Sequence, residues 1–257
     1  MTLPPELMDK ILEHVSADQW RGRQTLTACA LVATWWTGPS QRRLFSSVEI
    51  NQWNYQGWMD GVVYSASKNH LLEYVRSFSH GNRNMRTKYQ MRDFPRACWE
   101  YSSALRNLQS LAFFNTRIER IGKDMFHTCF SAFRETLACL SLNTIATSFS
   151  AFVDLVDYFP NITTLQLCSF ALKPEEGPVP PLSRPLRGKL EVNYLRTGTS
   201  GFAFLNQFAE LDLEYEELVV DASSLSIYAE AMFLESVLRI SAGTIKFLRL
   251  TEELRCE

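Results

Sequence analysis

The sequence predicts an α/β protein in which a short helical module precedes a longer array of parallel strands. Apolar residues of the first fifty positions recur at helical spacing, whereas the later chain repeats a short apolar strand pattern every 25 to 30 residues. The chain has 257 residues, of which 46% are hydrophobic, and can therefore bury a substantial core. We divide it into a helical module over residues 1–50 and a repeat domain over residues 51–257.

The first predicted helix opens at Pro4 and Pro5. Proline suits the first turn of a helix because the N–H group that it lacks would have no partner there, and because its φ angle is already helical. The apolar residues that follow share one helical face: Leu7, Ile11, Leu12 and Val15. The pattern therefore predicts an amphipathic helix.

The second helix is predicted from Thr25 to Trp36 and is apolar on almost every side. Alanines separate its larger apolar residues, which are Leu26, Cys29, Leu31, Val32, Trp35 and Trp36. A helix of this kind must be covered all round. The module offers only the first helix and a third one, predicted from Pro39 to Phe45, to cover it. The excess apolar surface indicates a protein partner.

The order of these residues resembles an F-box. Members of that family open with Leu-Pro-x-Glu-Leu, continue with Ile-Leu and end their second helix with Leu-Val-x-x-x-Trp. The matching residues here are Leu3, Pro4, Glu6, Leu7, Ile11, Leu12, Leu31, Val32 and Trp36. The alternative interpretation is a helical cap at the end of a solenoid, which would also need an apolar inner face.

The rest of the chain repeats the pattern Leu-x-x-Leu-x-Leu with some variation. Its central leucines are Leu111, Leu140, Leu165, Leu190, Leu218 and Leu248. This pattern at this period is the signature of leucine-rich repeats, in which alternate strand residues point inward and each strand needs the next to complete its hydrogen bonds. Residues 75–78 form an earlier and looser copy, and residues 208–213 are interpreted as an extra strand.

Helical patterns separate the strands. After Ser148, apolar residues fall on one helical face up to Phe159, and Pro160 ends the helix; residues 222–240 are also compatible with a helix. The alternation predicts a curved α/β solenoid. We expect it to be irregular, because Thr116, Ile145 and Phe170 replace the Asn or Cys that usually follows the strand. A doubly wound α/β domain is the alternative, but the chain has no glycine-rich phosphate loop.

An F-box followed by degenerate leucine-rich repeats is similar to the architecture of a large fungal family of F-box-like proteins. The segment at residues 40–50, Ser-Gln-Arg-Arg-Leu-Phe-Ser-Ser-Val-Glu-Ile, also resembles that family. Family members often run longer, and the last repeat here is unfinished, so a C-terminal truncation is one interpretation. The resemblance implies a substrate-recognition subunit of an SCF (Skp–cullin–F-box) ubiquitin ligase, which acts in ubiquitin-dependent degradation in the cytoplasm, the nucleus or both. The alternative is a leucine-rich scaffold outside any ligase.

The resemblance also implies the partners and the contact residues. A Skp-type adaptor, and through it a cullin, would bind the F-box, while the solenoid would hold a protein substrate whose identity the sequence does not give. The residues that would form or support the adaptor contact are Leu3, Pro4, Pro5, Leu7, Ile11, Leu12, Leu31, Val32 and Trp36. The best candidates for substrate contact are the strand positions expected to be exposed: Ser141, Gln166, Glu191 and Arg249.

Other function classes find little support in the sequence. A net charge of −2 gives no general attraction to nucleic acid or acidic membranes, and no apolar run of about eighteen residues predicts a membrane span. Residues 76–96 hold six basic residues against one aspartate, which we interpret as a solvated loop rather than a nucleic-acid site. The six cysteines form no CxxC pair, the four histidines share no ligand-like spacing, and no Gly-x-Ser-x-Gly elbow exists. We therefore expect no catalytic residues, no metal and no cofactor.

Overall fold

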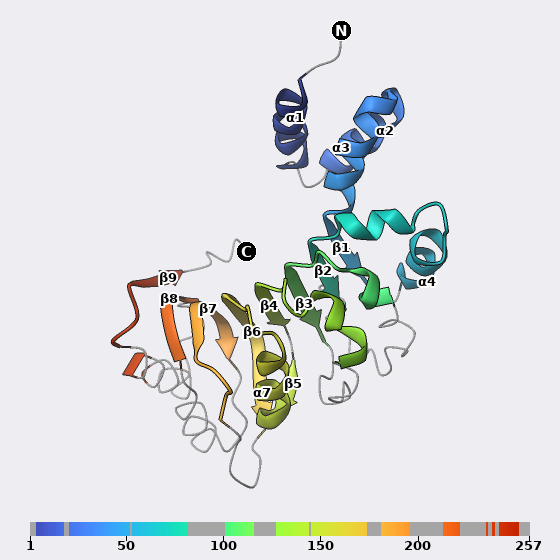
Figure 1. The fold of residues 1–257 in the computed structure, drawn as a ribbon. Helices are drawn as coiled ribbons and strands as arrows, with labels where there is room; N and C mark the ends of the chain where they lie inside the picture. The colour runs from blue at the N-terminus through green and yellow to red at the C-terminus, as the bar shows by residue number, and fades with distance from the viewer. Residues whose placement is uncertain are drawn as a thin grey trace.

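The computed structural model describes residues 4–17, 21–51, 53–81, 101–115, 127–143, 145–173, 181–195, 213–221, 235, 238–239 and 242–251. In these ranges three helices precede a sheet with helices and turns on one face (Figure 1). The three helices are α1 (Pro5–Ala17), α2 (Gly22–Val32) and α3 (Thr34–Phe45). The mixed helix and strand content confirms the α/β prediction. Most of the predicted helix over residues 222–240, most of the extra strand at 208–213 and residues 82–96 of the basic segment lie outside the described residues.

Eight strands follow one another along a single parallel sheet in the order of the chain. They are β1 (Ser47–Ile50), β2 (Ser77–His80), β3 (Ser110–Phe114), β4 (Cys139–Asn143), β6 (Thr164–Lys173), β7 (Leu186–Leu195), β8 (Leu213–Asp221) and β9 (Phe247–Thr251). The short strand β5 (Ala146–Ser148) pairs with β6 beside this path. Among the described strands the order never reverses, whereas a doubly wound sheet reverses at a switch point.

The central apolar residues of the repeats form one row across the sheet. Direct strand partners in this row are Val48, Phe78, Leu111, Leu140, Leu165, Leu190, Leu218 and Leu248. The predicted repeats, including the looser copy at residues 75–78, therefore place equivalent residues in register. All of these side chains except Leu248 are buried, because alternate residues of a strand point to the same face.

Short helices and turns cover this apolar face of the sheet (Figure 1). They are α4 (Tyr55–Trp58), the π-helical turn η1 (Met59–Val63), the 3₁₀ turns η2 (Asn69–Tyr74), η3 (Tyr101–Ala104) and η5 (Ser131–Phe133), and α7 (Phe149–Tyr158). Helix α7 confirms the prediction from its flanking residues, since the Ser148 hydroxyl accepts a hydrogen bond from the N–H of Ala151 at 3.3 Å and the helix ends before Pro160.

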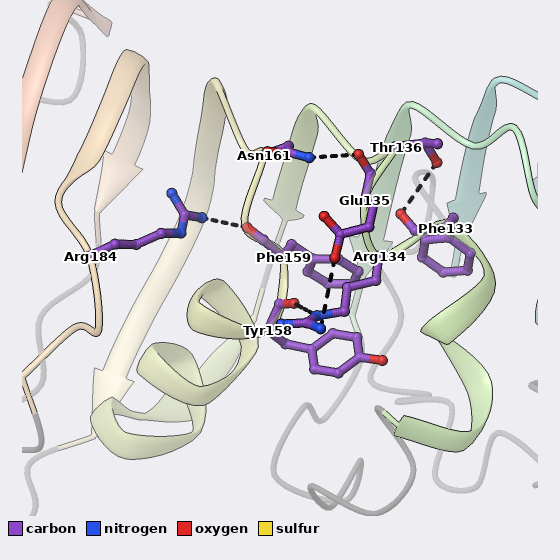
Figure 2. Close-up of polar contacts among 8 residues, drawn as sticks. All are labelled: Phe133, Arg134, Glu135, Thr136, Tyr158, Phe159, Asn161 and Arg184. Atoms are coloured by element: carbon purple, nitrogen blue, oxygen red, sulfur yellow. Dashed lines mark hydrogen bonds and ion pairs between the residues drawn. The ribbon is translucent and has the colours of Figure 1, made fainter.

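Hydrogen bonds from side chains that precede the strands link consecutive repeats (Figure 2). The Nδ2 of Asn161 donates to the carbonyl of Glu135 at 2.7 Å, and the Nδ2 of Asn107 donates to the carbonyl of Glu73 at 2.9 Å. The Thr136 hydroxyl donates to the carbonyl of Leu108 at 2.7 Å, and the Thr244 hydroxyl donates to the carbonyl of Tyr215 at 3.1 Å. The Arg184 guanidinium donates to the carbonyl of Phe159. These interrepeat bonds therefore form before the strand, whereas the Asn or Cys expected from leucine-rich repeats would follow it.

The helical module differs from the prediction in two places. Helix α2 ends at Val32 because Ala33 is extended, with φ −156° and ψ 148°, so Trp35 and Trp36 belong to α3. The Thr37 hydroxyl stabilises this break by donating to the carbonyl of Ala30 at 3.0 Å, near the end of α2, where carbonyls lack helical partners. Pro39 consequently lies inside α3 and does not begin it.

The boundary between the two parts also lies earlier than predicted. Residues 47–50 form strand β1, and the side chains of Val48 and Ile50 are buried in the core of the sheet. Only residues before Ser47 therefore belong to the helical module, and the assignment of residues 47–50 to that module was wrong.

Candidate protein-binding surfaces

The helical module has its own small core, separate from that of the sheet. Met8 and Leu12 of α1 pack with Leu26 of α2, and the partly buried residues around them are Val15, Cys29, Trp36 and Leu44. Leu12 is fully buried because it lies one turn after Met8 on the inner face of α1. Of the residues predicted for adaptor contact, Leu12 and Trp36 thus support the module from inside.

Other apolar residues of the module are exposed to solvent. Leu31 and Val32, at the end of α2, have exposed fractions of 83% and 77%, and Leu7 and Ile11 of α1 have 49% and 43%. Leu31 follows Leu26 by five residues, which places it on the far side of α2 from the small core. Pro4 is also exposed, Leu3 lies outside the described residues, and α1 begins at Pro5.

Trp35 is a further exposed apolar residue of the module that was not among the predicted contact residues. Because Ala33 ends α2, Trp35 stands at the start of α3, where it is about one-third exposed and its ring centroid lies 5.1 Å from that of Trp36. The local sequence held no signal for this break, since a continuous helix would have been equally apolar. We call Leu7, Ile11, Leu31, Val32 and Trp35 the apolar set of the module.

The charges near the apolar set differ between the helices. From residue 21 to residue 45 the chain carries four arginines, Arg21, Arg23, Arg42 and Arg43, and no acidic residue. Helix α1 instead carries Glu6, Asp9 and Glu13 together with Lys10. A partner that binds α2 and α3 would therefore present apolar side chains next to acidic ones.

Helix α3 connects the module directly to the sheet. The carbonyl of Ser46, the residue after α3, accepts hydrogen bonds from the N–H groups of Arg76 and Ser77 at 2.9 Å each. The Arg42 guanidinium lies 5.9 Å from the ring centroid of Tyr74, and the rings of Phe45 and Trp58 lie 6.4 Å apart. The sheet therefore fixes the orientation of α3.

The four predicted substrate-contact residues share one row on the outer face of the sheet, the face without the apolar core. In register, this outer row consists of Glu49, Ser79, Ala112, Ser141, Gln166, Glu191, Val219 and Arg249. Arg249 is exposed, whereas Gln166 and Glu191 are half-buried. The expectation that Ser141 is exposed was wrong, because its short side chain lies in the middle of the sheet and is buried.

A small polar network joins the outer faces of β6, β7 and β8. The Nε2 of Gln166 donates to a carboxylate oxygen of Glu191 at 2.7 Å. The Nζ of Lys189 lies 2.6 Å from the other Glu191 oxygen and 3.6 Å from Glu217. The hydrogen bond to Glu191 is the main reason why the pKa of Lys189 is raised. With two carboxylates and one ammonium group, the network is suited to contact basic or hydrogen-bond-donating side chains.

The described residues contain no group of three or more side chains suited to hold a metal ion. Burial lowers the pKa of His80 to about 3, so this histidine is neutral near pH 7. Burial also raises the pKa of the Cys139 thiol. None of the helices in the described ranges is long and apolar enough to cross a membrane.

Comparison with known proteins gives no relative for this chain: no family model, no curated protein and no solved structure matches it. The function must therefore be inferred from the apolar set of the module and from the outer row of the sheet.

Proposed function

We propose that this chain is a substrate-recognition subunit of an SCF-type ubiquitin ligase, as in the fungal F-box-like proteins that its sequence resembles. The observation that carries the proposal is the exposure of Leu31 and Val32 at the end of α2. The exposure of two adjacent aliphatic side chains to this extent is unfavourable in water unless a partner covers them. They occupy the positions that match the Leu-Val of the F-box pattern.

In this proposal a Skp-type adaptor covers the apolar set and links the chain to a cullin. Leu7, Ile11, Leu31 and Val32 contact the adaptor, and Trp35 extends that contact. Leu12 and Trp36 hold the helices in place from inside. The four arginines of the α2 and α3 region would attract acidic groups of the adaptor.

In this proposal the sheet binds the substrate. Parallel strands in chain order, with equivalent leucines in register, are typical of a leucine-rich-repeat solenoid. Gln166, Glu191 and Arg249 of the outer row are then the residues for substrate contact. Ubiquitin transfer belongs to other subunits of the ligase, and this chain contributes by holding the substrate close to them.

A pull-down with a purified Skp-type adaptor tests the proposal. We expect the wild-type chain to bind and Leu31→Asp to reduce binding at least tenfold, because the aspartate would bring a charge into an apolar interface. Tyr64→Asp is the matched control, since Tyr64 is also an exposed apolar residue but lies on the sheet domain. Circular dichroism should show that both variants keep the helix content of the wild type.

The alternative is a leucine-rich scaffold outside any ligase, in which the three helices only cap the solenoid. Phe45 of α3 packs against the core of the sheet, which favours the interpretation of the module as a cap. A folded wild-type chain that does not bind the adaptor, or equal binding by Leu31→Asp and wild type, would exclude the ligase proposal in favour of the scaffold.

A further inference from the structure

Strand β9 (Phe247–Thr251) leaves one edge of the sheet open in the described structure. It pairs with β8 on one side, and no described strand lies on the other. Phe247 has an exposed fraction of 67%, and Leu248 has 50% although its row partners from Val48 to Leu218 are buried. The row of central apolar residues is therefore incomplete at β9.

The opposite edge of the sheet is protected. At β1, the carbonyl of Glu49 accepts a hydrogen bond from the Nδ2 of Asn54 at 2.7 Å, and the Oδ1 of Asn54 accepts one from the N–H of Asn51 at 2.8 Å. Val48 and Ile50 are buried. A turn that occupies edge carbonyl groups prevents pairing with another strand. We find no comparable turn at β9 within the described residues.

We propose that the edge of β9 on which the structure describes no strand binds an extended segment of a partner protein as an additional strand, and that this segment has the pattern aliphatic–acidic–aliphatic. Strand addition uses the unpaired N–H and C=O groups of an edge for affinity and alternate side chains for specificity. The proposal stands independently of the adaptor contact. If the chain is a ligase subunit, the segment belongs to the substrate.

The aliphatic positions follow from the register of the sheet. Leu248 and Leu250 are the strand partners of Leu218 and Val220 of β8, so they continue two rows of the sheet, the first of which is the row of central apolar residues. A further strand would lie about 4.8 Å from β9. Aliphatic residues in that strand would cover the exposed side of Leu248 and extend the core by one strand.

The acidic position follows from Arg249, which lies between these two leucines on the outer face. Arg249 is exposed and forms no ion pair with the described residues. An acidic residue at the middle of the added strand would be its direct neighbour. The sheet already contains one such pair, because Lys189 of β7 is the strand partner of Glu217 of β8 and their charged groups lie 3.6 Å apart.

The chain itself provides a probe with this pattern. Residues 46–51 read Ser-Ser-Val-Glu-Ile-Asn, so that Val48, Glu49 and Ile50 have the required order. In the folded protein this segment is part of the sheet and is not available, but a free peptide can adopt the extended form.

The test is a titration of the fluorescein-labelled peptide 46–51 with the full chain, followed by fluorescence anisotropy up to millimolar protein. We expect saturable binding that Leu248→Lys weakens about tenfold and Arg249→Glu weakens three- to tenfold. The decisive arm exchanges the charges: a peptide with Glu49→Lys should bind poorly to the wild type and better to Arg249→Glu. Lys68→Glu, an exposed charge reversal in the turn before η2, is the control and should leave binding unchanged.

Absence of saturable binding by the wild type would overturn the proposal, as would equal binding by the wild type and Arg249→Glu with both peptides. The two proposals fail separately. Leu31→Asp should bind the peptide normally, and Arg249→Glu should bind the adaptor normally, so loss of one activity identifies the surface that is responsible.

Discussion

At the scale of single residues, His80 shows how the sheet couples stability to pH. It is the last residue of β2, its row partner in β3 is Phe113, and the two rings meet edge-on with centroids 6.5 Å apart. The side chain is fully buried, and burial disfavours the charged imidazolium, which explains the pKa of about 3. In the unfolded chain the same residue would titrate near its ordinary value of 6.5.

This difference predicts that the folded protein loses stability as the pH falls below about 6.5. Between that pH and about 3 the unfolded chain binds a proton at His80 and the folded chain does not, so protons favour unfolding. From pH 7.5 to pH 5.0 the contribution of His80 is a loss of about 2 kcal/mol in the free energy of unfolding. Urea unfolding at pH 7.5 and pH 5.0 measures this contribution. The free energy of unfolding of His80→Leu should fall by about 2 kcal/mol less than that of the wild type between these pH values. Equal pH dependence of the two proteins would contradict the assignment.

At the scale of elements, the turns before the strands carry a regularity that the sequence does contain. Asn107, Thr136, Asn161 and Thr244 each precede the central leucine of their repeat by four residues, and each donates a hydrogen bond to a backbone carbonyl of the preceding repeat. Figure 2 shows Asn161 and Arg184 making such links on neighbouring turns. These bonds reinforce the register of adjacent strands that the apolar rows already specify.

Removing one of these links should therefore cost stability. We expect Asn161→Ala to lower the free energy of unfolding by about 1 kcal/mol, since it leaves the carbonyl of Glu135 without the Asn161 side chain. Asn69→Ala is the matched control, because Asn69 is an exposed asparagine at the start of η2. Chemical denaturation of the two variants measures the difference, and an equal effect would show that the interrepeat bond contributes nothing.

At the scale of the whole molecule, two separate cores predict two units of unfolding. The module is held by Met8, Leu12 and Leu26, whereas the sheet shares one large core from Val48 to Leu218. In a stack of repeats each element depends mainly on its neighbours, so damage at one end need not spread. The contact of α3 with the sheet is the connection between the units.

Leu26→Asp should accordingly unfold the module and spare the sheet. A charge in a core of three buried residues removes most of its stability, while strands β3 to β6 keep all their neighbours. Hydrogen exchange should show lost amide protection in α1 and α2 and unchanged protection in β3, β4 and β6. The comparison variant Leu140→Asp should instead remove protection throughout the sheet. Simultaneous loss everywhere in Leu26→Asp would mean that the molecule is one cooperative unit.

The sheet was predictable from the sequence alone, because the information needed is local. Strand residues alternate between two faces, so the spacing of Leu111, Leu140 and the later central leucines was enough to predict strands that share a register. Helix α7 was predictable for the same reason, since Ser148 and Pro160 mark its ends. Strand β1 was missed, because its four residues lie next to a helix and were assigned to the module.

The sequence pattern does not predict which apolar and polar side chains reach solvent, because solvent exposure depends on tertiary packing. Leu12 and Leu31 are both leucines of the F-box-like pattern, yet Leu12 is fully buried and Leu31 is 83% exposed. Ser141 and Arg249 share one row, yet the first is buried in mid-sheet and the second is exposed on β9, the last of the described strands. Exposure depends on which elements pack nearby, and within the described residues the extended Ala33 and the unpaired edge of β9 determine that packing. A local pattern specifies the face of a residue, but distant segments determine whether that face is covered.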